Sequence, residues 1–122
     1  MKKIYLLLLS EDTILLDIRT RKEYCKDHIK GAILLPTSPP PFTERELLVL
    51  KDQLWWVLSN ITHSRSTPII IYCQKGKRSI IAKKLAMQLG YRNVISLGGA
   101  EEYPLNEIFK NKHMICHHDP TN

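Results

Sequence analysis

The chain has 122 residues, of which 43% are hydrophobic and 25% charged. This length is below the roughly 150 residues typical of one domain, so we expect a single domain over residues 1–122 and exclude a separate substrate domain. The composition is that of a globular protein and excludes disordered and fibrous classes. A core of this size needs no metal or disulfide for stability.

The net charge of +6 is concentrated in one part of the chain. Residues 53–100 contain seven Lys and Arg residues and no Asp or Glu, and the rest of the chain sums to −1. A field of one sign attracts anions, although a solvated basic face would show the same pattern. Nucleic acid is the partner that fits least, because no aromatic residues alternate with the cations.

The cysteines are Cys25, Cys73 and Cys116, an odd number without a Cys-x-x-Cys pair. This pattern argues against a disulfide framework and against a four-ligand zinc site. The apolar run at 4–9 is too short for a signal peptide, and no run approaches the ~18 residues of a membrane span. We therefore expect a cytoplasmic protein that does not contact a membrane.

The first half of the chain shows two short apolar runs and one long amphipathic segment. Residues 13–18 and 32–35 have the length and composition of buried strands, and residues 19–27 between them are polar and suited to a helix. Three prolines at 39–41 predict a stiff loop. The spacing of apolar residues predicts a helix over 43–61, with Thr43 and Glu46 as a capping box.

The second half contains the strongest strand, residues 69–73, which is apolar on both faces as a central parallel strand should be. A helix is expected from about Ser79 to Leu89, followed by Gly90 as the residue after its C-cap. Residues 94–97 predict a last strand and residues 101–110 a short helix. Because strands alternate with helices, we expect an α/β fold with a mostly parallel sheet and helices on both faces.

Cys73 ends the predicted central strand, and a glycine-containing loop and a helix follow it. Backbone N–H groups of such a loop favour negative charge, so a thiol at this position is stabilised as a nucleophilic thiolate. Lys75, Lys77 and Arg78 add positive charge beside it. The alternative is an inert cysteine at a strand end, which the density of cations disfavours. The spacing does not fit a phosphate-binding loop of the GxxxxGK type.

Four ordered segments resemble the signatures of single-domain rhodaneses, a family of sulfurtransferases. They are Leu15–Arg19 followed by Glu23 and Tyr24, then His28–Ala32, Ile71–Ser79, and Gly98 with Gly99. The resemblance extends from about residue 13 to residue 103. The chain departs from the family pattern at Asp27, Lys30 and Tyr103, which all lie away from the loop after Cys73.

The resemblance implies a rhodanese-like fold and a persulfide mechanism. Cys73 would be the catalytic nucleophile, taking sulfur from thiosulfate or a persulfide donor and passing it to a thiol or cyanide acceptor. The substrate-binding residues would be those of the loop: Gln74, Lys75, Gly76, Lys77, Arg78 and Ser79. No metal or organic cofactor is implied, and a sulfur-relay protein is a further partner of the same chemistry.

Two other functions occur on similar folds. Dual-specificity phosphatases and arsenate reductases resemble this fold, but their loops place five residues between cysteine and arginine, whereas four separate Cys73 from Arg78. Inactive rhodanese-like binding modules typically lack the cysteine. Both alternatives remain open to an assay that compares sulfur transfer with hydrolysis of an aryl phosphate.

The remaining polar residues have structural interpretations. We expect His28 to make a structural hydrogen bond, Asp17 to pair locally or orient loop groups, and Cys25 to pack as a neutral thiol. His113, Cys116, His117 and His118 lie in the last ten residues without a second set of ligands, so residues 111–122 are expected to be a flexible tail rather than a metal site.

Overall fold

The computed structural model describes residues 10–38 and 41–99. The elements follow one another as β1 (Ile14–Asp17), α2 (Arg21–Lys26), β2 (Ile33–Leu34), α3 (Glu44–Ile61), β3 (Ile69–Cys73), α4 (Lys77–Gln88) and β4 (Val94–Gly99). The strands form one sheet in the order β2-β1-β3-β4, and every neighbouring pair is parallel. The expected α/β fold is confirmed. The helix expected at 101–110 and the tail at 111–122 lie outside the described residues.

The two central strands, β1 and β3, are buried along their whole length. Each has a neighbouring strand on both sides and helices over both faces of the sheet. Side chains that point to either face are therefore buried. This explains why their sequences are continuous apolar runs rather than alternating ones.

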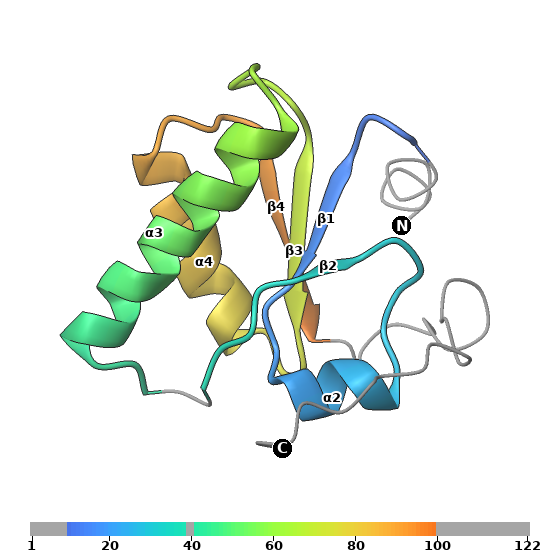
Figure 1. Cartoon of the computed structure of the whole chain (residues 1–122), viewed down its shortest axis with the longest axis vertical. Helices are drawn as coiled ribbons and strands as arrows, with labels where there is room; N and C mark the ends of the chain where they lie inside the picture. Colours follow the sequence, from blue (N-terminus) through green and yellow to red (C-terminus); the bar gives the residue numbers. More distant parts are fainter. Residues whose placement is uncertain (1–9, 39–40, 100–122) are drawn as a thin grey trace.

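The helices cover the sheet unequally (Figure 1). α3 and α4 lie on one face, where their apolar side chains pack on alternate residues of the strands, among them Ile14 and Leu16 of β1 and Ile69 and Ile71 of β3. On the other face Tyr24 of α2 packs with Ile29 and Ala32 against Leu15, Ile70 and Tyr72. The expectation of helices on both faces is confirmed, with the short α2 and its following loop forming the thinner layer.

α3 follows its predicted course. The Thr43 side chain accepts a hydrogen bond from the Glu46 amide, and the Glu46 carboxylate accepts one from the Thr43 amide. The predicted capping box is therefore confirmed. Leu50, Leu54 and Leu58, spaced four residues apart, are buried and attach the helix to the sheet.

α4 begins at Lys77, two residues earlier than predicted. Its N-cap is Gly76, whose φ of 91° lies in the left-handed region, and no side chain caps the helix. Glycine adopts this conformation without steric cost, so the chain turns into the helix without a Ser, Thr or Asp signal in the sequence. Lys77 and Arg78 therefore belong to the first helical turn rather than to the loop.

All four strands run in one direction, so their carboxyl ends lie at one edge, at the bottom of Figure 1, where α2 and the start of α4 also lie. Open parallel sheets hold their ligands at this edge. No helix among the described residues has the length and apolar character needed to span a membrane.

Candidate functional site

Cys73 is the last residue of β3, and its side chain is fully buried. Its Sγ accepts hydrogen bonds from the backbone N–H of Gly76 at 3.0 Å and of Ser79 at 3.4 Å. The Ser79 hydroxyl lies 3.6 Å from the same sulfur. Three polar groups thus converge on one atom, and the chain between them forms a tight turn around it.

The donors come from the loop and from the first turn of α4. The first N–H groups of a helix have no partner within the helix, and here they are directed to the sulfur. Such amides, together with the positive end of the helix, stabilise a negative charge placed among them. The Gly76 and Ser79 amides therefore direct their positive ends to the Cys73 sulfur.

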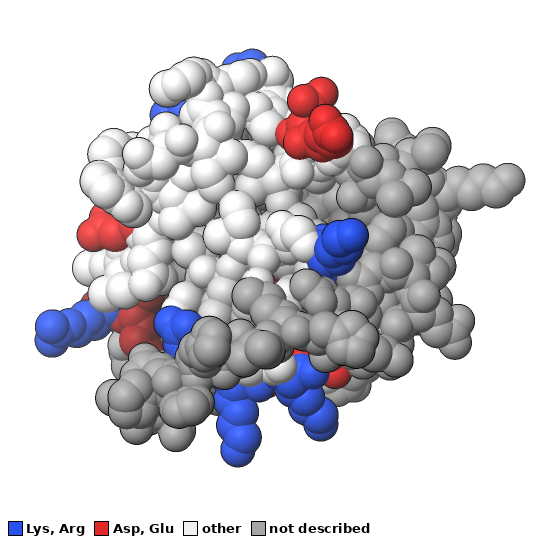
Figure 2. Space-filling view, turned by 45° about the vertical axis from the view of Figure 1, so that its right-hand side comes forward, with Lys and Arg blue, Asp and Glu red and all other residues white. Residues whose placement is uncertain are grey.

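A surface pocket of about 470 Å³ lies over this turn. It is lined by Thr20, Glu23, Cys73, Gln74, Lys75, Lys77 and Arg78. Lys75 and Lys77 are exposed, and within the described residues neither is in an ion pair. Figure 2 shows Lys and Arg side chains gathered along the lower edge of the molecule, the edge that carries this pocket. An anion in the pocket would lie beside the exposed ammonium groups of Lys75 and Lys77.

Arg78 is placed differently from the two lysines. It is buried, and its guanidinium donates to both carboxylate oxygens of Glu23 at 3.0 and 3.3 Å. Burial acts to raise the pKa of Glu23, but the hydrogen bonds from Arg78 and Thr20 and the charge of Arg78 outweigh it, so the pKa lies below its usual value. This pair joins α2 to α4 across the pocket floor.

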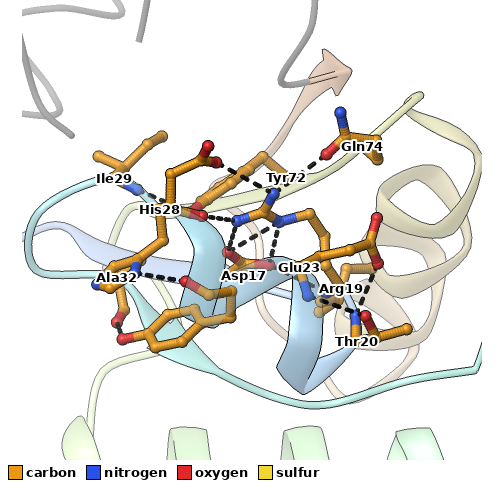
Figure 3. A network of polar contacts seen from close by, with 12 residues as sticks. Asp17, Arg19, Thr20, Glu23, His28, Ile29, Ala32, Tyr72 and Gln74 are labelled. Atoms are coloured by element: carbon orange, nitrogen blue, oxygen red, sulfur yellow. Dashed lines mark hydrogen bonds and ion pairs between the residues drawn. The ribbon is translucent and has the colours of Figure 1, made fainter. Parts of the chain in front are cut away.

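A second arginine, Arg19, connects the sheet to the loop (Figure 3). Its guanidinium donates to both carboxylate oxygens of Asp17, to the backbone carbonyl of Asp27 and, at 3.1 Å, to the side-chain oxygen of Gln74. Burial acts to lower the pKa of Arg19, yet the hydrogen bond and charge of Asp17 raise it above its usual value. Arg19 is thus held as a cation and fixes the residue next to Cys73.

The aromatic residues around this network are structural. His28 is buried, stacks on the Tyr24 ring with centroids 3.7 Å apart, and its Nδ1 bonds the Tyr24 carbonyl at 2.9 Å. The Tyr72 hydroxyl accepts a hydrogen bond from the Ile29 amide, and burial together with the Asp17 charge raises the pKa of Tyr72. The expected structural role of His28 is confirmed.

The structure gathers the predicted site residues in one place. Gly76 and Ser79 supply donors to the sulfur, while Gln74, Lys75, Lys77 and Arg78 line the pocket. Asp17 pairs locally with Arg19 and so orients the loop, as expected. Sequence reasoning did not assign Thr20, Glu23 or Arg19 to the site. The segments Asp17–Arg19 and Glu23–Tyr24, which carry part of the family resemblance, were the signal that could have pointed to Arg19 and Glu23.

Cys73 is the free thiol among the described cysteines. The structure corrects the expectation for Cys25, whose sulfur is disulfide-bonded rather than a neutral packed thiol. No group of three or more metal-ligating side chains occurs in the described parts of the chain, 10–38 and 41–99. The predicted cluster of His113, Cys116, His117 and His118 lies outside these residues.

Comparison with known proteins identifies the family. The model of the rhodanese-like domain matches residues 2–104, so the chain belongs to the rhodanese-like domain family. A sulfurtransferase of Allochromatium vinosum is 32% identical over 90 residues, which cover 74% of this chain and 69% of the relative. The thiosulfate sulfurtransferase PspE of Escherichia coli is 23% identical over 93 residues, 76% of each chain.

Solved structures agree on the fold. The human single-domain sulfurtransferase TSTD1 superimposes with a TM-score of 0.64 at 25% identity, covering 88% of this chain and 93% of that one. Curated relatives also include a tRNA uridine(34) hydroxylase of Yersinia enterocolitica, which is 28% identical over 93 residues. The matched segment is 24% of the length of that hydroxylase. The rhodanese-like segment therefore also occurs as part of longer proteins.

We expect Glu23→Gln to destabilise the protein by roughly 1–2 kcal/mol at pH 7, because it removes the charge that pairs with buried Arg78. The pKa of Glu23 is lowered in the folded state, so its contribution is present above the unfolded value and is lost as pH falls below 4.5 through the folded value. Urea unfolding at pH 7 and at steps from pH 5 to pH 3 measures this difference.

The matched control is Glu44→Gln, on the exposed first turn of α3, which should change stability by less than about 0.5 kcal/mol. The gap between wild type and Glu23→Gln should close as the pH falls. A gap at pH 3 as large as that at pH 7 would show that the Glu23 charge is not what joins α2 to α4.

Proposed function

We propose that this chain is a sulfurtransferase that carries a sulfur atom as a persulfide on Cys73. The donor is a small sulfur-containing anion such as thiosulfate or a persulfide, and the acceptor is cyanide or a thiol. The observation that carries the proposal is the convergence of the Gly76 and Ser79 amides on the Cys73 sulfur, at the floor of a pocket edged by two lysines. Membership of the rhodanese-like family and the names of the relatives support it.

The first half-reaction uses the thiolate as a nucleophile. The Cys73 sulfur attacks the outer sulfur of thiosulfate, a new S–S bond forms, and the original S–S bond breaks with its electron pair leaving on sulfite. The charge moves onto the terminal sulfur of the persulfide. The loop amides that contact Sγ would stabilise this persulfide anion, which supports the proposal.

The second half-reaction returns the enzyme to its starting state. The acceptor attacks the terminal sulfur, the bond between the two sulfurs breaks, and the Cys73 thiolate leaves with the electron pair. With cyanide the product is thiocyanate, and with a thiol it is a new persulfide. A protein that presents a thiol or persulfide would serve in the same way, as a sulfur-relay partner.

The pocket assigns different roles to the basic residues. Lys75 and Lys77 are exposed at its rim and would bind the donor's negative oxygens through charge-assisted hydrogen bonds. Arg78 already satisfies Glu23, so we propose that it acts on the donor mainly through its field. Gln74 is held by Arg19 and would present its amide to the pocket in a fixed orientation.

The length of the loop argues against a phosphatase or arsenate reductase. A tetrahedral phosphoryl group needs a wider ring of amides and an arginine free to bind its oxygens. Here Arg78 comes one residue too early and is paired with Glu23. The inactive binding module is disfavoured by the buried, amide-bonded thiol of Cys73.

We expect thiosulfate to add the mass of one sulfur atom to the protein, and cyanide to remove it. Intact-mass spectrometry followed by peptide mapping locates the adduct. Cys73→Ser should abolish the adduct, whereas the Cys25→Ser/Cys116→Ser double variant, which keeps Cys73 as its single cysteine, should retain it. An adduct that survives Cys73→Ser, or hydrolysis of an aryl phosphate faster than sulfur transfer, would contradict the proposal.

Lys75→Ala and Lys77→Ala should each raise the KM for thiosulfate about tenfold or more, because each removes one charge-assisted contact worth roughly 1.5–3 kcal/mol. Steady-state kinetics with cyanide as acceptor measure this change, and kcat should change less. Lys84→Ala, on the exposed side of α4 beyond the site, is the matched control. Equal losses at all three lysines would indicate a diffuse field rather than a binding site.

A further inference from the structure

A line of hydroxyl groups leads from β4 to the Cys73 sulfur. The Ser96 Oγ donates to the Ser79 Oγ at 2.8 Å, and the Ser79 Oγ lies 3.6 Å from Cys73 Sγ. The Ser79 hydroxyl itself donates to the Gly76 carbonyl at 3.0 Å. Ser79 is fully buried and Ser96 is half-buried, so the hydroxyls meet in a place that is largely closed to water.

The register of β4 with β3 places Ser96 there. In the register of β3 with β4, Ile71 is paired with Ser96, but Cys73 is paired with Gly99, so β4 contains one extra residue between the two pairs. Ser96 comes before this extra residue and is paired with Ile71, whose side chain packs on the face covered by α3 and α4, so the Ser96 hydroxyl reaches Ser79 in the first turn of α4.

The hydrogen-bonding capacity of Ser79 explains why the contact matters. A hydroxyl has one proton and two lone pairs. With Cys73 as a thiol, Ser96 and the S–H group occupy the two lone pairs, and the Ser79 proton goes to the Gly76 carbonyl. When the thiol proton leaves to solvent, the Ser79 O–H can turn toward the sulfur and become a third donor to it.

We propose that Ser96 is a positioning residue that keeps Ser79 ready to donate to the Cys73 thiolate. Its bond holds the Ser79 oxygen beside the sulfur, and donation into a hydroxyl strengthens that hydroxyl as a donor in turn. The inference extends the proposed function, since the same anion is the nucleophile of sulfur transfer. It concerns only the ionisation of the resting thiol and can be tested without any sulfur donor.

The test compares Ser96→Thr with Ser96→Val, two β-branched side chains of nearly equal volume that suit a strand and differ in the hydroxyl. The readout is the rate of Cys73 alkylation by iodoacetamide from pH 5 to pH 10, measured by peptide mapping in the protein that keeps the Cys25 disulfide. Ser96→Thr should keep the wild-type profile. Ser96→Val should shift the profile to higher pH and lower the rate at pH 7 about three- to tenfold.

A double-mutant cycle shows whether Ser96 acts through Ser79. In a Ser79→Ala background the Thr and Val variants should react alike, because the intermediate hydroxyl is gone. Identical Thr and Val profiles with Ser79 present would overturn the inference, and so would a Thr–Val difference that persists in Ser79→Ala. If the Thr–Val difference appears but thiosulfate leaves no adduct on Cys73, the proposed function fails and the role of Ser96 stands.

Discussion

The site depends on a guanidinium buried at the carboxyl edge of the sheet. Arg19 is 2% exposed, so its charge and its donors must be met by protein groups rather than by water. Asp17 meets most of this demand, and the remaining donors reach the Asp27 carbonyl and the Gln74 side chain. One cation therefore ties the end of β1, the end of α2 and the loop after β3 into a fixed arrangement.

Within that arrangement, backbone N–H groups donate the hydrogen bonds to the Cys73 sulfur. Gly76 turns the chain in a conformation that suits glycine, and the first turn of α4 directs its amides inward. Charged residues act at a distance from the sulfur: Arg78 is held by Glu23, and the two lysines stand at the pocket rim. In the proposed function, the Cys73 sulfur is stabilised by amide dipoles that do not have to move, while the exposed Lys75 and Lys77 would bind an incoming anion.

Local patterns predicted most of the fold and the centre of the site. The Thr43–Glu46 capping box and the apolar run before Cys73 carry their signals within a few residues, and both are confirmed. The sequence predicts the start of α4 two residues too late, because the N-cap Gly76 begins the helix by its left-handed backbone conformation and has no capping side chain. The Arg78–Glu23 pair joins residues 55 positions apart, and the Ser96–Ser79 contact joins residues 17 positions apart through the register of β4 with β3. Neither is visible in the local sequence.

The central claim is that the Gly76 and Ser79 amides hold negative charge on the Cys73 sulfur. Two-dimensional ¹H–¹⁵N NMR of labelled protein measures it directly, by following both amide resonances as the thiol ionises and again when thiosulfate is added. If the amides hold the charge, both resonances move with the pH profile of Cys73 alkylation and move again on persulfide formation, and neither change occurs in Cys73→Ser. Amide resonances that stay in place while the thiol ionises and takes up sulfur would contradict it.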